Sequence, residues 1–206
     1  MARYISFGRT MKYRIILASK SPRRRELLSI IEPDYVTAPD RDVEENYPAN
    51  LKADEVPAYL SQLKSRAYAA DAAVGDIIIT ADTVVILGDE ILGKPADTAD
   101  AVEMLRKLSG RTHRVVTGVT ICAPGAAVRT FTVTTDVTFS NIAESDIEYY
   151  VEHYMPLDKA GAYGIQEWIG AVAVEKISGS YYNVVGLPLH KLFHELRAVK
   201  SELSCR

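Results

Sequence analysis

Cysteine and histidine are scarce in this sequence, and neither residue type forms a pattern that would hold a structural metal. Among 206 residues there are two cysteines, Cys122 within an apolar run and Cys205 next to the last residue. This number excludes a disulfide framework and a cysteine-based zinc site, and it is typical of proteins from a reducing cytosol. His190 and His194 have the spacing of a zinc-binding helix, but no glutamate stands between them in the required place. We therefore expect a cytoplasmic protein without a zinc site.

Long apolar runs and a strong net charge are also absent. No stretch approaches the ~18 apolar residues of a membrane-spanning helix, so we expect no membrane association. The 24 lysines and arginines nearly balance the 27 aspartates and glutamates, which gives a formal net charge of -3. Such a chain has no general attraction for duplex nucleic acid, and no aromatic stacking ladder accompanies its basic residues. We expect no nucleic-acid partner, and any basic site must be local.

The mixture of strand-like and helix-like segments predicts an α/β fold with a mixed sheet. With 48% hydrophobic residues, the chain can bury a substantial core. Strands are expected at residues 13–18, 115–121, 128–139 and 171–177, and in a run over 77–87 that is interrupted at 80–83 and returns as a hairpin through 91–92. Helices are expected from Ser21-Pro22 onward and at residues 58–73, 98–108, 144–154 and 189–203, with a long polar loop over 33–57. We treat Met1 to Thr10 as an extension or tag and expect residues 11–206 to form a single domain.

The segment from Ser19 to Arg25 carries four cations and two hydroxyl groups between a predicted strand and a predicted helix. Cations in a first helical turn oppose the helix dipole, which costs a few tenths to ~1 kcal/mol each unless an anion neutralises them. Free backbone N–H groups, hydroxyls and guanidinium groups together make a phosphate site, whereas the alternative is a solvated basic patch. Since no histidine is close in sequence to activate Ser19 or Ser21 as a nucleophile, we favour phosphate contact.

Asp82 lies within a strongly apolar run, where burying a carboxylate without partners is costly. It is therefore either a metal ligand or general base, or a structural acid bonded to backbone amides. If it lies near Glu45 and the segment from Ser19 to Arg25 (the phosphate segment), Asp82 would suit metal binding or water activation. Lys94 lies between Gly93 and Pro95, in a turn that could aim its ammonium group at a phosphate or could simply be a surface turn.

Two glycine-containing segments nearer the C-terminus could line the same cleft. In residues Asp158 to Gln166, small side chains allow the backbone to approach a ligand closely. Gln166 carries both a donor and acceptors, so it could bind the edge of a base. The segment from Gly179 to Pro188 connects a predicted strand to a predicted helix. For both segments a tight structural loop is the alternative.

Taken together and in this order, these segments resemble the Maf family, the septum-formation-inhibitor-like nucleotide pyrophosphatases. The matching stretches are Ala18–Leu28, Ala81–Val85, Leu92–Pro95, Leu108–His113, Asp158–Gln166 and Gly179–Pro188. The resemblance implies a mixed twisted sheet with flanking helices and two lobes around a nucleotide cleft, related to the inosine triphosphate pyrophosphatases. It also implies a divalent metal, magnesium or manganese, and a homodimer.

The resemblance also implies roles for particular residues. Asp82 would be the proton acceptor and would hold the metal together with Glu45. Base specificity would depend on Arg24, Thr83 and Gln166, and the phosphates would be contacted by Ser19, Arg23, Lys64 and Lys94.

The pair Asp82-Thr83, together with Tyr163-Gly164-Ile165-Gln166, looks like the branch of the family that acts on dTTP and UTP, rather than the branch that acts on 7-methyl-GTP. The expected reaction is hydrolysis at the α-phosphate to the nucleoside monophosphate and pyrophosphate, with modified pyrimidine nucleotides as further candidate substrates. A non-catalytic nucleotide-binding regulator of cell division is the alternative. The chain departs from the family in one place, because Glu167 and Trp168 follow the glutamine where the family often has glycine. Trp168 could alter the pocket mouth or the dimer contact.

Overall fold

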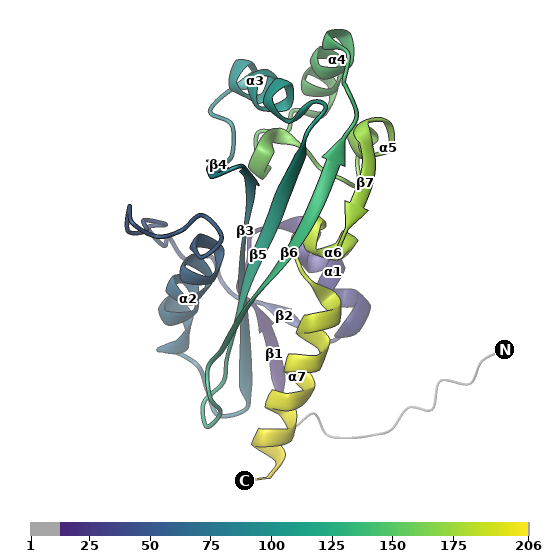
Figure 1. The fold of residues 1–206 in the computed structure, drawn as a ribbon. Helices are drawn as coiled ribbons and strands as arrows, with labels where there is room; N and C mark the ends of the chain where they lie inside the picture. The colour runs from purple at the N-terminus through teal and green to yellow at the C-terminus, as the bar shows by residue number, and fades with distance from the viewer. Residues whose placement is uncertain (1–12, 206) are drawn as a thin grey trace, which may run out of the picture.

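A mixed β-sheet runs through the length of the molecule, and helices cover both of its faces (Figure 1). The structure is a computed structural model that describes residues 13–205. The extension predicted for Met1 to Thr10 lies outside the described residues. Among the residues described, no helix is both long and apolar enough to cross a bilayer.

The sheet has seven strands, with β4 paired to β3 beside the main order β2-β1-β3-β5-β6-β7. The strands are β1 (Arg14–Leu17), β2 (Val36–Thr37), β3 (Asp76–Leu87), β4 (Glu90–Leu92), β5 (Thr112–Cys122), β6 (Arg129–Phe139) and β7 (Val174–Ser178). β1 runs parallel to β2 and β3, whereas all other pairs are antiparallel. The predicted α/β class with a mixed sheet is therefore confirmed.

The helices begin largely where the capping signals predict. They are α1 (Pro22–Ile31), α2 (Val56–Ala69), α3 (Thr98–Leu108), α4 (Glu144–Tyr154), the short η1 (Ala160–Ala162), α5 (Trp168–Ala173), α6 (Tyr181–Val185) and α7 (Leu189–Ser204). The side chain of Ser21 accepts a hydrogen bond from the backbone of Arg24, and that of Asp97 accepts one from the backbone of Asp100. Each of these bonds satisfies one of the free N–H groups of a first helical turn.

Three sequence predictions about the strands are wrong. The long loop expected over residues 33–57 contains the short strand β2, and α2 already begins at Val56. β3 runs unbroken through residues 80–83, where an interruption is expected from the polar residues. Residues 171–173 complete α5, so the last strand begins only at Val174. Alanine has the highest helix propensity of all residues, so Ala171 and Ala173 favour helix over strand. The boundary between α5 and β7 is then decided by the packing of the surrounding structure. The short helix α6 was not predicted.

β3 has a bare stretch on one of its edges. Residues 76–79 of β3 pair with β1, and residues 85–87 pair with β4. On the opposite edge, β5 pairs with β3 continuously from Ile78 to Ile86. Between β1 and β4, residues 80–84 therefore have no strand partner on that edge in the described chain. Side chains and loops can therefore approach the middle of β3 at this stretch.

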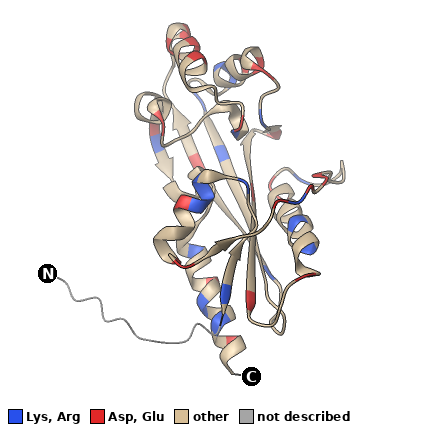
Figure 2. Cartoon of the chain, turned by 180° about the vertical axis from the view of Figure 1, so that it is seen from behind, with Lys and Arg blue, Asp and Glu red and all other residues tan. Residues whose placement is uncertain are grey.

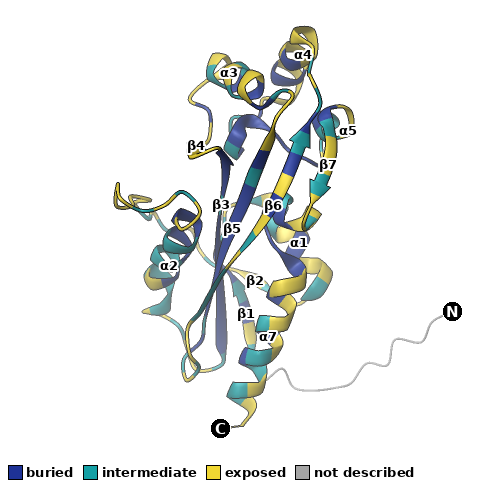
Figure 3. Ribbon diagram, viewed as in Figure 1, coloured by how far each residue is buried: buried dark blue, intermediate teal, exposed yellow. Residues whose placement is uncertain are grey.

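Alternate residues of β3 point to opposite faces of the sheet, as the pleat of a strand requires. Val84 and Ile86 pack with Val56 and Leu60 of α2. Ile77, Ile79 and Ala81 instead pack with α1 and α7. Figure 3 shows β3 and β5 as the most deeply buried strands (dark blue). At the bare edge, Asp82 consequently faces α2 while Thr83 faces the side of α1 and α6.

Candidate active site

A cleft of about 670 Å³ opens at the bare edge of β3. It is bounded by the start of α1, the loop around residues 40–47, α2 and the segments 158–166 and 184–186. All nine residues predicted for the site line this cleft: Ser19, Arg23, Arg24, Glu45, Lys64, Asp82, Thr83, Lys94 and Gln166. Seen from behind in Figure 2, basic and acidic residues are otherwise mixed over the molecule.

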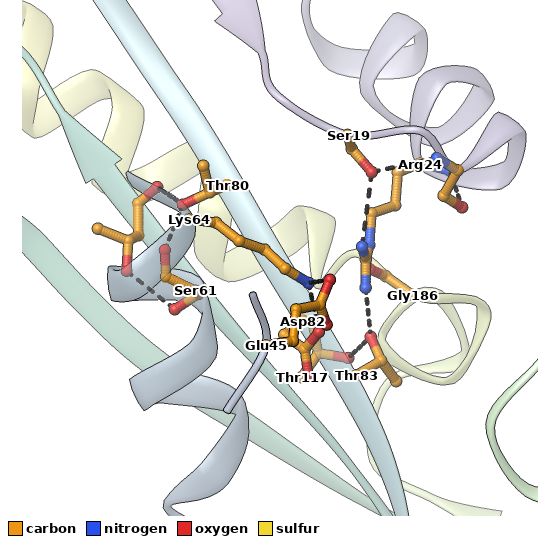
Figure 4. Close-up of polar contacts among 12 residues, drawn as sticks. Ser19, Arg24, Glu45, Ser61, Lys64, Thr80, Asp82, Thr83, Thr117 and Gly186 are labelled. Carbon is orange, nitrogen blue, oxygen red and sulfur yellow. Dashed lines mark hydrogen bonds and ion pairs between the residues drawn. The ribbon is translucent and has the colours of Figure 1, made fainter. Parts of the chain in front are cut away.

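On the α2 side of β3, two carboxylates converge on one ammonium group (Figure 4). The Lys64 Nζ lies 2.7 Å from Asp82 Oδ1 and 3.0 Å from Glu45 Oε1. Asp82 is 8% exposed, so it is nearly buried and yet borders the cleft. The charge of Lys64 offsets the cost of burying this carboxylate, which explains how an acid is accommodated in mid-strand.

A set of buried hydroxyl groups fixes α2 and thereby Lys64. The Thr80 hydroxyl donates to the carbonyl of Ser61 at 2.7 Å, and the Ser61 and Thr120 hydroxyls lie 2.9 Å apart. Ser61 and Lys64 are three residues apart on α2, so they share a helix face. The backbone at Gly118 also touches α2, since a Cβ there would lie 2.3 Å from the Pro57 carbonyl. These contacts hold Lys64 against the carboxylates.

On the other face of β3, the guanidinium group of Arg24 is held by neutral oxygen atoms. Its Nε donates to the Gly186 carbonyl at 2.9 Å, and its Nη2 donates to the Thr83 hydroxyl at 3.0 Å (Figure 4). A longer contact of 3.5 Å joins Nη1 to the Ser19 hydroxyl. Burial lowers the pKa of Arg24, an effect that the charge of Asp82 opposes. An arginine stays protonated in proteins, so its positive charge is retained in the cleft.

The hydroxyl of Thr83 is already engaged within the protein. The Thr117 hydroxyl donates to the Asn183 carbonyl at 3.0 Å and lies 2.9 Å from the Thr83 hydroxyl. Because Thr117 has only one hydroxyl proton, Thr83 must donate to Thr117 and accept from Arg24. Thr83 therefore orients Arg24 and can offer a ligand only a remaining lone pair.

The phosphate segment is tied to the segment 158–166 across the cleft. Arg23 Nη1 donates to Asp158 Oδ2 at 2.9 Å, and Lys159 Nζ lies 2.7 Å from Asp158 Oδ1. Burial raises the pKa of Asp158, but Lys159 and Arg23 outweigh it, so the net shift is downward and the carboxylate stays ionised at neutral pH. Nearby, Gly161 donates to the Gly93 carbonyl at 3.0 Å and thereby holds the turn that carries Lys94.

Lys94 and Gln166 are exposed, in contrast to the buried residues at the centre of the cleft. Within residues 13–205, the Gln166 amide makes no hydrogen bond to another side chain or to the backbone. Its donor and acceptor atoms are therefore free to pair with a ligand. Trp168 packs edge-on against Tyr149 of α4, with ring centroids 5.0 Å apart, and does not line the cleft.

The carboxylates of Asp82 and Glu45 suit a divalent cation. Magnesium is usually held by one or two carboxylates and completed by water and substrate phosphates. The two side chains already converge on a single positive charge, that of Lys64. In the described part of the chain, no group of three or more His, Cys, Asp or Glu residues could hold a metal. The two carboxylates therefore fit a divalent cation whose other ligands are water and phosphate oxygens.

The sequence alone did not point to Ser61 or Thr117 as residues that position the site, and it placed Asp158 and Lys159 only in a segment that could line the cleft. Ser61 becomes a neighbour of the site through the tertiary fold. The sequence did contain a feature that points to Thr117, because threonines recur along β5 and β6. Hydroxyl groups at such buried positions need partners.

Comparison with known proteins identifies the family of this chain. Residues 14–199 match the family of Maf-like proteins. A Bacteroides thetaiotaomicron protein named dTTP/UTP pyrophosphatase is 50% identical over 190 residues, which span 92% of this chain and 98% of that protein. A protein of the same name from Porphyromonas gingivalis is 50% identical over 188 residues, covering 90% of this chain and 94% of that one.

The fold is also similar to that of a solved structure, the Staphylococcus aureus Ham1 protein. The TM-score is 0.55 at 22% identity, with 90% of this chain and 98% of that chain covered. The fold and the cleft thus define an α/β protein with a mixed sheet and a charged cleft at the bare edge of one strand. The chain belongs to the Maf family.

Proposed function

We propose that this protein hydrolyses dTTP and UTP to the nucleoside monophosphate and pyrophosphate. The observation that carries the proposal is the position of Asp82, nearly buried beside Lys64 and Glu45 yet bordering a cleft whose other walls bear cations. The relatives at 50% identity named dTTP/UTP pyrophosphatase support the choice of substrate.

The reaction begins with water positioned against the α-phosphorus of the nucleotide. Asp82 takes a proton from this water as its oxygen bonds to phosphorus, and the bond from the α-phosphorus to the oxygen that bridges to the β-phosphate breaks. The electron pair of that bond leaves with pyrophosphate. A divalent metal, magnesium or manganese, would be held by Glu45 and Asp82 and would polarise the attacking water.

Cationic side chains stabilise the charge that develops on the phosphate oxygens. Arg23 and Lys94 border the cleft with Ser19, whose hydroxyl can donate to a phosphate oxygen. Lys64 lies beside the reacting centre and offsets negative charge there. Such contacts are stronger in a site that excludes water than in bulk solvent.

Base selection is assigned to the Gln166 amide, with Arg24 and Thr83 shaping the floor of the cleft. Uracil and thymine present a carbonyl and a ring N–H side by side, which one amide can pair simultaneously. The 5-methyl group of thymine is tolerated, because one methylene changes affinity by only ~1–3 kcal/mol in an apolar pocket. Modified pyrimidine nucleotides fit the same reasoning.

We also propose that residues 11–206 act as a single domain in a cytoplasmic homodimer. Both cysteines are free thiols, which suits a reducing compartment. Tyr149, Met155 and Val172 are exposed apolar side chains on and beside α4 and α5, which suits burial against a second copy. Sedimentation velocity on the purified protein would test the dimer, and a monomer at all concentrations would contradict it.

Product analysis tests the proposed function. The purified protein is incubated with magnesium or manganese and each common or methylated nucleoside triphosphate, and the products are separated. We expect pyrophosphate together with UMP or dTMP, and slower turnover of CTP, whose amino group replaces the acceptor. Release of orthophosphate would contradict the reaction, and equal rates for UTP and CTP would contradict the role of Gln166. Nucleotide binding without turnover would favour a non-catalytic regulator.

A further inference from the structure

Glu167 directly follows Gln166 in the chain and lies next to the segment 158–166 that lines the cleft. It occupies the N-cap position of α5, but its side chain makes no capping hydrogen bond there. The backbone of Glu167 instead closes a turn by donating to the Gly164 carbonyl at 2.9 Å. Its carboxylate is therefore available for contacts within the protein, next to Gln166.

The Glu167 carboxylate binds two buried side chains. One oxygen accepts a hydrogen bond from the Tyr150 hydroxyl, and the other lies 3.2 Å from Lys159 Nζ. Tyr150 is fully buried and Lys159 is 7% exposed. Burial, together with the bond to Glu167, raises the pKa of Tyr150, so its hydroxyl keeps its proton and remains a donor.

The same hydroxyl of Tyr150 also fixes the backbone of the base-binding segment. It accepts a hydrogen bond of 3.0 Å from the Gly164 amide. A Cβ at Gly164 would lie 2.8 Å from the Glu167 carboxyl carbon and 2.9 Å from Gln166 Nε2. The carboxylate thus lies against the backbone that carries Gln166.

We infer that Glu167 is a positioning residue that sets the base selectivity of this protein by holding the turn at residues 163–166. This inference rests on the proposed function and deepens it. The Glu167 carboxylate accepts a hydrogen bond from the Tyr150 hydroxyl, and this hydroxyl accepts one from the Gly164 amide. The two bonds fix the turn and thereby the position of the Gln166 amide in the cleft. A glycine at position 167 could make none of these contacts.

The Glu167 contacts continue toward the phosphate segment. Lys159 bridges Glu167 to Asp158, and Asp158 binds Arg23 at the start of α1. A continuous series of ion pairs therefore connects Glu167, next to Gln166, with the start of α1. A nucleotide whose base does not match Gln166 cannot shift the turn without breaking this series.

The test compares binding of non-hydrolysable α,β-imido analogues of UTP and CTP by calorimetry, alongside steady-state kinetics with UTP and CTP. The variants are Glu167→Gln, which keeps the shape but removes the charge, and Tyr150→Phe, which keeps the buried ring. Glu152→Gln, an exposed glutamate on the same helix as Tyr150, is the matched control. Thermal unfolding verifies that every variant is folded.

We expect each test variant to lower the preference for UTP over CTP by about tenfold, less than the ~10²-fold that a 1 Å displacement of a reacting group can cost. The double variant should be no less selective than the more affected single variant, because both act on one turn. The control should match the wild type. Turnover of UTP at saturation should fall by less than about threefold, since the reacting centre is unchanged.

A folded variant pair that retains the wild-type preference in both binding and kinetics would overturn the inference while leaving the proposed function intact. Equal binding of both analogues by the wild-type protein would instead remove the proposed base selectivity, and the inference with it. An equal loss of selectivity in Glu152→Gln would also overturn the inference, because the effect would then come from removing any negative charge and not from the contacts of Glu167.

Discussion

The two faces of β3 at its bare edge bring different chemistry to the same cleft. On the α2 face, Asp82 is held by an ion pair with Lys64, which also binds Glu45. On the opposite face, the neutral hydroxyl of Thr83 accepts a hydrogen bond from the Arg24 guanidinium group and is itself bonded to the Thr117 hydroxyl. One residue step along a strand separates these two environments, because the pleat sends neighbouring side chains to opposite faces.

This difference divides the tasks of the site. A carboxylate in an ion pair can accept a proton and can exchange its partner for a metal or a water molecule. A set of neutral hydroxyls cannot supply a base, but it holds a guanidinium group in a fixed place. We therefore expect changes on the Asp82 face to affect turnover and changes on the Thr83 face to affect mainly substrate affinity.

The largest effect is expected for Asp82→Asn. This change keeps the volume of the side chain but removes the group that accepts the proton, so kcat should fall by about 10²–10⁴-fold. Binding of a non-hydrolysable UTP analogue should be retained within a few-fold. Pyrophosphate release and calorimetry measure the two quantities, and near wild-type turnover in the variant would refute the assignment.

A smaller loss is expected for Lys64→Met, which removes the cation between the two carboxylates. Charge on the phosphate oxygens would lose one stabilising partner, so kcat/KM for UTP should fall by roughly 10²-fold. Lys107→Met is the matched control, because Lys107 forms an exposed ion pair with Glu90 on the surface at 2.6 Å. Similar kinetics for the two variants would indicate that Lys64 serves only to keep Asp82 buried.

A change on the other face of β3 should have a different kinetic signature. Thr83→Val removes the hydroxyl between Arg24 and Thr117, a loss of about 1 kcal/mol per hydrogen bond. KM for UTP should rise by about three- to tenfold while kcat stays within about twofold. Thr112→Val, which breaks an exposed hydroxyl pair with Thr138, serves as the control. A large fall in kcat for Thr83→Val would remove the distinction between the faces.

The smallest effect on turnover is expected at His113, which lies outside the cleft and should affect stability alone. It is 1% exposed, and burial lowers its pKa to about 4. The folded protein therefore disfavours protonation that occurs near pH ~6.5 in the unfolded chain. Neutral His113 therefore makes its full contribution to the free energy of unfolding above about pH 6.5. This contribution is lost as the pH falls from about 6.5 toward 4, which lowers the free energy of unfolding by up to about 3 kcal/mol.

Urea unfolding of the wild type and His113→Gln at pH 7 and pH 4.5 measures this effect. The variant should lose less stability than the wild type between the two pH values, and kcat at pH 7 should be unchanged within about twofold. His153→Gln, at an exposed histidine, should behave as the wild type does. Equal pH dependence for wild type and His113→Gln would contradict the assignment.

Much of the fold follows from local signals, and the site follows only in part. The cap at Ser21 begins α1 as predicted, and α3 spans the predicted residues 98–108, because helix starts depend on residues next to each other in sequence. The unbroken strand through Asp82 could not be predicted, since the partner that makes it possible lies on α2. The residues that line the cleft were predicted together through the family resemblance. Which of them lie on each face of β3 became clear only from the structure of the sheet.

The most direct test of the central claim is hydrolysis of UTP in water enriched in ¹⁸O, followed by mass spectrometry of both products. The proposed attack at the α-phosphorus places one ¹⁸O atom in the phosphate of UMP and none in pyrophosphate. Label found in pyrophosphate, or in released orthophosphate, would mean that water attacks another phosphorus atom and would contradict the mechanism proposed for Asp82.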